Sequence, residues 1–219
     1  MTPAAADERF PSRSTVRRAC VLGETATATA IAFYLALRLQ TSLAWLLLGL
    51  CLIFAGRRPV SRYGLDLRLR PPALHVHALL GASLLSLYGA GHAALSAFRW
   101  HQTFALRLPE NPLADLAREI LIVAFPEEVF FRGYVQSRWD LAWGKRCRLF
   151  GASIGPGLLA QAGLFAICHL ASGDWWRLSV FFFGLLAGWL RARSGSLLGP
   201  IAYHAVANLW VRTLSASFH

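Results

Sequence analysis

Three ionisable side chains lie close together in the segment PEEVFFRGY, residues 126–134, in the middle of a long apolar run. Each such group costs roughly 2.5–3.5 kcal/mol at the centre of a membrane helix, so ionisable residues there are most often functional. Residues four apart share one face of a helix, which predicts an ion pair between Glu128 and Arg132. Glu127 points about 100° away from Glu128 at 3.6 residues per turn. We therefore expect the Glu127 carboxylate to lie outside this ion pair and to serve another purpose.

Two later apolar segments repeat the four-residue spacing with other side chains. Phe165 and His169 lie in FAICH, and His204 and Asn208 lie in HAVAN. Since hydrocarbon offers no solvation, the polar groups should turn to the interior of a helical bundle and meet there. A carboxylate, two imidazoles and an amide in a dry pocket could take a proton from water and donate hydrogen bonds to an oxyanion. The three motifs together favour a hydrolytic centre. Other polar residues in or beside the apolar runs are interpreted as packing groups: Glu24, His75, His77, His92 and His101.

The composition predicts that this centre lies in a membrane protein. Of the 219 residues, 56% are hydrophobic and only 15% are charged, and the mean hydropathy is +0.45. A soluble domain carries about 25% charged residues. The apolar runs predict an all-α, polytopic transmembrane helical bundle with about seven spans, in a range of six to eight. The expected helices are 19–37, 42–56, 74–98, 113–137, one within 149–171, 175–192 and 197–216.

The distribution of the net charge of +11 indicates how the chain is oriented in a membrane and argues against nucleic-acid binding. Of the 22 lysines and arginines, 15 lie in the segments 9–18, 57–70, 138–148 and 191–193, which punctuate the apolar runs. Cytoplasmic loops carry such an excess and contact anionic lipids. We therefore expect a multi-pass integral membrane protein with a cytoplasmic N-terminus. Its expected parts are a cytoplasmic segment 1–18, N-terminal transmembrane helices 19–112 and a catalytic helical core 113–216.

The order of the motifs EExxxR, FxxxH and HxxxN resembles the CPBP family. This family comprises the CAAX-prenyl-protease and bacteriocin-processing intramembrane proteases, also called Abi proteins. The resemblance covers about residues 113–212. It extends to the sequence FFRGY after the glutamates and to SGSLLGPIAYHAVANLW around the last motif. It implies an intramembrane glutamic endopeptidase, without metal ion or cofactor, in a bacterial inner membrane.

The resemblance also implies roles for single residues. Glu127 would be the general base, and His169 would help to hold and activate the water. His204 and Asn208 would stabilise the oxyanion. The implied supporting residues are Glu128, Arg132 and Phe165. The implied partner is a membrane-anchored protein or peptide that is cut near its C-terminus or anchor, and a protein-sorting role is the branch we favour. The oligomeric state is left open.

Three alternatives compete with this interpretation. Two histidines and a glutamate could hold a catalytic zinc ion with a water in the fourth position, although the helical zinc signature HExxH is missing. A non-catalytic membrane immunity or scaffold protein could share the fold, but it would not need an unpaired Glu127 beside a paired Glu128. A transporter is the weakest alternative, because the sequence shows no repeated half and no paired broken helices.

Overall fold

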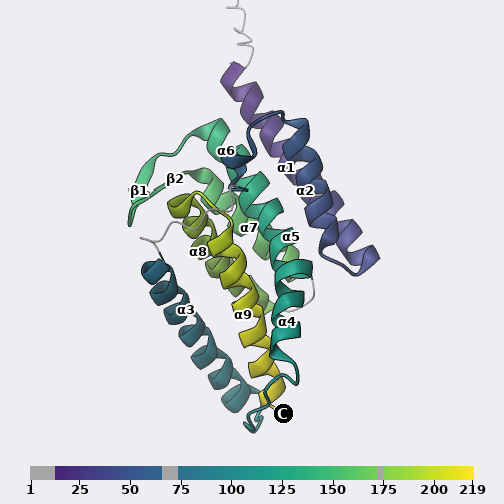
Figure 1. Ribbon diagram of the computed structural model, residues 1–219, viewed down its shortest axis with the longest axis vertical. Helices are drawn as coiled ribbons and strands as arrows, with labels where there is room; N and C mark the ends of the chain where they lie inside the picture. The colour runs from purple at the N-terminus through teal and green to yellow at the C-terminus, as the bar shows by residue number, and fades with distance from the viewer. Residues whose placement is uncertain (1–12, 66–73, 172–174) are drawn as a thin grey trace, which may run out of the picture.

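The computed structural model describes residues 13–65, 74–171 and 175–219, which form a bundle of helices (Figure 1). The helices are α1 (Arg13–Leu39), α2 (Leu43–Ala55), α3 (Leu74–Ala94), α4 (Pro112–Arg118), α5 (Phe125–Glu128), α6 (Gln136–Trp143), α7 (Pro156–Leu170), α8 (Val180–Ser194) and α9 (Leu198–Ser217). The predicted all-α class is confirmed, with one small addition. The strands β1 (Cys147–Leu149) and β2 (Ala152–Ile154) pair as an antiparallel hairpin.

The motif EExxxR lies on a continuous helix built from several pieces. Two π-helical stretches, η4 (Glu119–Ala124) and η5 (Val129–Val135), join α4, α5 and α6 end to end. Pro126 lacks a backbone N–H, and its ring would clash with the carbonyl four residues earlier in a regular helix. The wider turn of η4 ends at Ala124, two residues before Pro126, where it can relieve this clash. π-Helical turns are frequent at functional sites, and here they flank the two glutamates.

The hairpin of α1 and α2 packs along this central helix (Figure 1). Glu24 on α1 forms an ion pair with Arg138 on α6 and accepts a hydrogen bond from the Tyr134 hydroxyl. Trp45 on α2 packs against Phe130, with ring centroids 4.9 Å apart. Ion pairing and aromatic packing thus fasten the N-terminal helices to the helix that carries the glutamates.

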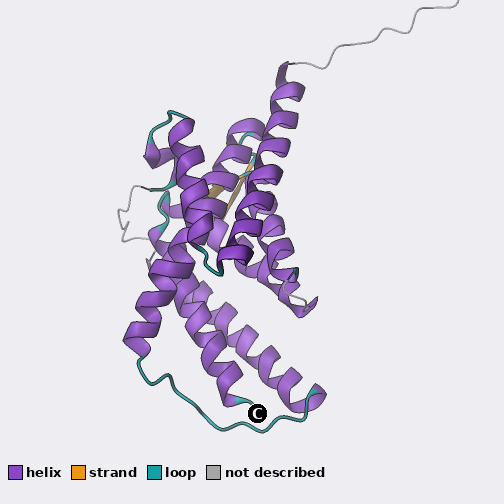
Figure 2. Ribbon diagram, turned by 90° about the vertical axis from the view of Figure 1, so that its right-hand side faces the viewer, coloured by secondary structure: helices purple, strands orange, loops and turns teal. Residues whose placement is uncertain are grey.

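Helix α3 takes a different place, at the outer edge of the bundle beside α9 (Figure 1). The indole of Trp210 on α9 donates a hydrogen bond of 3.1 Å to the carbonyl of Leu85 on α3. A Cβ added to Gly89 would lie only 3.1 Å from the Trp210 ring, so glycine permits this close approach. Figure 2 shows the long loop that follows α3 and runs past the C-terminus to α4.

Several helix boundaries differ from the predicted ones. The helix expected within 149–171 is confirmed as α7, which begins at Pro156 because the hairpin occupies the residues before it. Gly151 turns that hairpin with a φ of +80°, and proline suits the first position of a helix. The helix expected at 175–192 begins at Val180 after a 3₁₀ turn, Trp175–Ser179. The first helix begins at Arg13, inside the segment predicted to be cytoplasmic, and residues 1–12 lie outside the described part.

In the described part of the chain, two helical segments are long and apolar enough to cross a bilayer, Ser14–Leu39 and Ala78–Arg99. The helices Leu43–Ala55 and Pro156–Leu170 are apolar but shorter. These segments support a membrane protein. The seven spans, the orientation of the N-terminus and the bacterial inner membrane stay predictions.

Candidate active site

A fully buried ion pair forms the inner part of the site. Nη1 of Arg132 donates a hydrogen bond of 2.8 Å to Oε1 of Glu128, and both residues are 0% exposed. The guanidinium lies 4.3 Å from the centre of the Phe165 ring, within the range of a cation–π interaction. The ion pair predicted from the four-residue spacing is therefore confirmed. Phe165, which the FxxxH motif singled out, covers its cation.

His204 on α9 connects this ion pair to the neighbouring glutamate. Its Nδ1 lies 2.8 Å from Oε1 of Glu128, and its Nε2 lies 3.8 Å from Oε2 of Glu127. An ionised carboxylate only accepts hydrogen bonds, so Nδ1 carries a proton when Glu128 is ionised. His204 thus turns Nε2 toward Glu127. The sequence predicted that these groups meet, but it did not predict that His204 contacts both glutamates.

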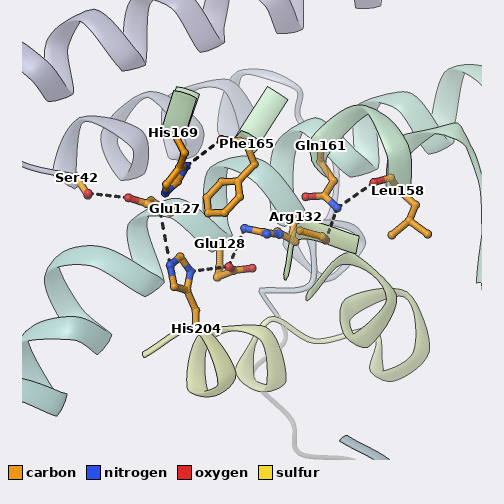
Figure 3. Close-up of polar contacts among 10 residues, drawn as sticks. Ser42, Glu127, Glu128, Arg132, Leu158, Gln161, Phe165, His169 and His204 are labelled. Carbon is orange, nitrogen blue, oxygen red and sulfur yellow. Dashed lines mark hydrogen bonds and ion pairs between the residues drawn. The ribbon is translucent and has the colours of Figure 1, made fainter. Parts of the chain in front are cut away.

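Glu127 has a different set of contacts from Glu128. Its Oε1 accepts a hydrogen bond of 2.8 Å from the hydroxyl of Ser42, at the start of α2. Its Oε2 is buried and has no hydrogen-bond partner among the described residues. Figure 3 shows the carboxylate joined by dashed lines to Ser42 and to His204. The expectation that Glu127 lies outside the ion pair of Glu128 and Arg132 is confirmed.

A cavity of about 330 Å³ gives access to Glu127 from the side of the N-terminal helices. His169 on α7 lines the same cavity. Its Nδ1 lies 2.9 Å from the carbonyl oxygen of Phe165, which favours a proton on Nδ1 and a lone pair on Nε2. The walls come from α1, α2 and the central helix, and include Phe33, Leu37, Trp45, Ile122, Val123 and Phe131. The cavity therefore combines a carboxylate and an imidazole with an apolar wall, and Arg118 and Arg177 also line it.

Asn208 lies one turn along α9 from His204 and belongs to a neighbouring network. Its Nδ2 donates a hydrogen bond of 3.0 Å to Oε2 of Glu119. Glu119 is 4% exposed and also accepts a hydrogen bond of 3.1 Å from Nη1 of Arg212. No hydrogen bond joins Asn208 to the two central glutamates in the described structure. The residues that the structure brings together directly are Glu127, Glu128, Arg132, Phe165, His169 and His204.

Sequence reasoning missed two residues that contact the site. Glu119 is a carboxylate inside the apolar run 113–137, so the argument that singled out Glu127 applied to it as well. Ser42 had no comparable signal, because it lies 85 residues from Glu127 in the chain. Small hydroxyl residues are common at the ends of apolar runs, and only the contact distinguishes this one.

Metal binding was the main chemical alternative. Within residues 13–65, 74–171 and 175–219, no group of three or more His, Cys, Asp or Glu side chains is arranged to hold a metal ion. The prediction of metal-free chemistry stays a prediction, and the chelator experiment below addresses it.

Comparison with known proteins gives one match. Residues 109–210 match the family described as type II CAAX prenyl endopeptidase Rce1-like. No curated protein and no solved structure matches the chain. The matched segment contains all three motifs, so the match confirms the CAAX-protease family that the motifs indicated. Helices α1 to α3 lie outside it.

Proposed function

We propose that this chain hydrolyses a peptide bond with a water molecule that Glu127 activates. Its residues 109–210 match the Rce1-like type II CAAX prenyl endopeptidase family. The family supports a membrane endopeptidase of the CAAX type, and the glutamate mechanism is our proposal. One observation carries it. Glu127 lines the cavity of about 330 Å³ together with His169, whereas its neighbour Glu128 is fully buried against Arg132 and His204.

The proposed reaction begins with a water molecule between Oε2 of Glu127 and Nε2 of His169. Glu127 takes one proton from this water while the oxygen attacks the carbonyl carbon of the scissile peptide. The carbonyl oxygen becomes an oxyanion, and a tetrahedral intermediate forms. Glu127 then passes the proton to the leaving amine, the C–N bond breaks, and the carboxylate is restored for the next cycle.

The oxyanion needs hydrogen-bond donors, and His204 is suited to this role. With Glu127 and Glu128 ionised and Arg132 positive, the three side chains sum to one negative charge. A proton on Nε2 of His204 would neutralise the cluster and supply a donor beside Glu127. Asn208 has two N–H donors. Glu119 holds one of them, and we assign the second to the oxyanion.

The substrate that we propose is a membrane-anchored protein or peptide, cut near its C-terminus or its anchor. The apolar cavity walls from Phe33, Trp45 and Phe131 support a substrate that approaches from the bilayer. A protein-sorting role would follow if the anchor itself is removed. A proteomic comparison of membrane-anchored proteins in cells with and without this chain would identify the substrates.

A cleavage assay on purified protein in liposomes tests the mechanism. The change Glu127→Gln keeps the size of the side chain but removes the base, so turnover should fall about 10²–10⁴-fold without loss of thermal stability. Glu110→Gln is the matched control, because Glu110 is exposed in the loop before α4, and it should cleave like the wild type. A strong chelator should leave wild-type turnover unchanged.

The outcomes separate the alternatives. Wild-type turnover by Glu127→Gln would overturn the catalytic assignment. Turnover that a chelator abolishes and zinc restores would support the metal alternative. A cellular phenotype that survives Glu127→Gln would support an immunity or scaffold protein.

A further inference from the structure

A second cavity, of about 290 Å³, lies at the end of the bundle where α6 and the β-hairpin are found (Figure 1). It shares no lining residue with the cavity at Glu127. Its lining residues are Arg62, Ser137, Asp140, Leu141, Lys145 and Arg191. Three of these six side chains are cationic and one is acidic, so the cavity has a surplus of positive charge.

Arg191, near the end of α8, is the buried cation of this cavity. It is only 6% exposed. Its Nη2 donates hydrogen bonds of 2.7 Å to the carbonyl of Arg62 and 2.6 Å to the hydroxyl of Ser137, and its Nε has no partner. Both acceptors are neutral, and Arg191 forms no ion pair with a described carboxylate. Since a buried charge is costly without a counterion, the cavity beside Arg191 suits an anion.

Asp140 does not fill this need, because its side chain is directed toward the start of α7. A Cβ added to Gly157 would lie only 2.6 Å from Oδ1 of Asp140. The carboxyl group therefore faces the positive end of the helix dipole. Burial raises the pKa of Asp140, and the nearby charges of Lys145 and Arg191 only partly oppose this effect.

We propose that this cavity binds the phosphate group of an anionic phospholipid headgroup. The basic segments 57–70 and 138–148, which the charge distribution assigns to the cytoplasmic side, both contribute to it. Basic pockets between transmembrane helices on that side bind anionic headgroups, and guanidinium groups form strong, paired hydrogen bonds with phosphate. A soluble phosphate shares this chemistry. The proposal does not depend on proteolysis.

Thermal unfolding of the purified full chain in a neutral detergent tests the proposal. Phosphatidylglycerol, phosphatidylcholine and inorganic phosphate are titrated separately, and the unfolding midpoint is measured. Phosphatidylglycerol should raise the midpoint, and phosphatidylcholine should raise it much less. Lys145→Gln should weaken the apparent affinity for phosphatidylglycerol about fivefold, as expected for one basic residue at an anionic surface. Arg148→Gln is the control, because it removes the same charge from the exposed strand β1 outside the cavity.

An effect of phosphatidylglycerol that Lys145→Gln weakens and Arg148→Gln leaves unchanged supports the lipid site. A midpoint that inorganic phosphate raises equally, with the same difference between the two variants, supports the phosphate chemistry with a soluble source. Equal losses in Lys145→Gln and Arg148→Gln would show general surface attraction and overturn the proposal. So would a midpoint that neither anion changes.

Discussion

On one side of the central helix, Glu128 lies among Arg132, His204 and Phe165 with no exposed surface. On the other side, Glu127 faces a cavity between the N-terminal hairpin and α7. The two carboxyl groups are chemically identical and adjacent in the chain. The difference lies in their neighbours, because Glu128 contacts a charged guanidinium and an imidazole, whereas Glu127 accepts a hydrogen bond from Ser42 and lines the cavity with His169.

We expect the side chains around Glu128 to contribute mainly to stability and those around Glu127 mainly to the reaction. A change on the core side should unpair a buried charge and lower the free energy of unfolding. A change on the cavity side should mainly slow the reaction. Three further predictions test the boundary between the two sides.

The largest expected effect is that of Arg132→Ala on the core side. The change leaves Glu128 buried without its cation, which should lower the free energy of unfolding by about 3–5 kcal/mol and reduce activity as well. Denaturation of the purified variant and its abundance in the membrane measure the effect. Arg146→Ala, at an exposed site, should change the free energy of unfolding by less than about 0.5 kcal/mol.

The double change Glu128→Leu with Arg132→Leu sharpens this prediction. It removes both charges, so abundance should recover relative to Arg132→Ala. Activity should recover less, because His204 loses the acceptor of its Nδ1 proton. If Arg132→Ala alone left stability, abundance and turnover at wild-type values, the assignment of a stabilising ion pair would be wrong.

The next effect is that of Asn208→Ala, which removes the donor that we propose for the oxyanion. Turnover should fall about 10²–10³-fold, with little change in the KM for substrate. Single-turnover cleavage of a fixed peptide substrate gives the rate. His92→Ala on α3 is the control and should leave turnover near the wild-type value, since His92 packs against Tyr88 and Phe218 away from the site. Equal losses in the two variants would contradict the role of Asn208.

The smallest effect is expected for Ser42→Ala, which removes the hydrogen bond to Glu127. A hydrogen bond to a charged group is worth about 1.5–3 kcal/mol, so turnover should fall about 10- to 150-fold. Ser42→Thr keeps the hydroxyl and should retain most of the activity. Ser83→Ala on α3, whose hydroxyl donates a hydrogen bond to the carbonyl of Leu79 on the same helix, should cleave like the wild type. Full turnover by Ser42→Ala would show that the N-terminal hairpin does not position the base.

Spacing within single helices predicted a large part of the site. Glu128 and Arg132 pair as the four-residue spacing requires, and Phe165 and His169 share one face of α7 with ring centroids 4.3 Å apart. The all-α class followed from composition for a similar reason, since apolar runs long enough for helices are visible in the chain. The hairpin at 147–154 was missed, because each strand has only three residues and the first overlaps the basic segment 138–148.

The contacts between different helices could not be predicted from the spacing of residues within each helix. Helical periodicity fixes the angle between two side chains on one helix, but not which neighbour that face meets. Both α1–α2 and α3 lie outside the matched segment 109–210 and read alike as apolar runs. Yet α2 donates a hydrogen bond from Ser42 to Glu127, whereas α3 packs against the outer side of α9. The order of the residues predicted only that the Glu127 carboxylate lies outside the ion pair of Glu128 and Arg132. The groups that orient it come from segments far away in the chain, and packing in three dimensions alone selects them.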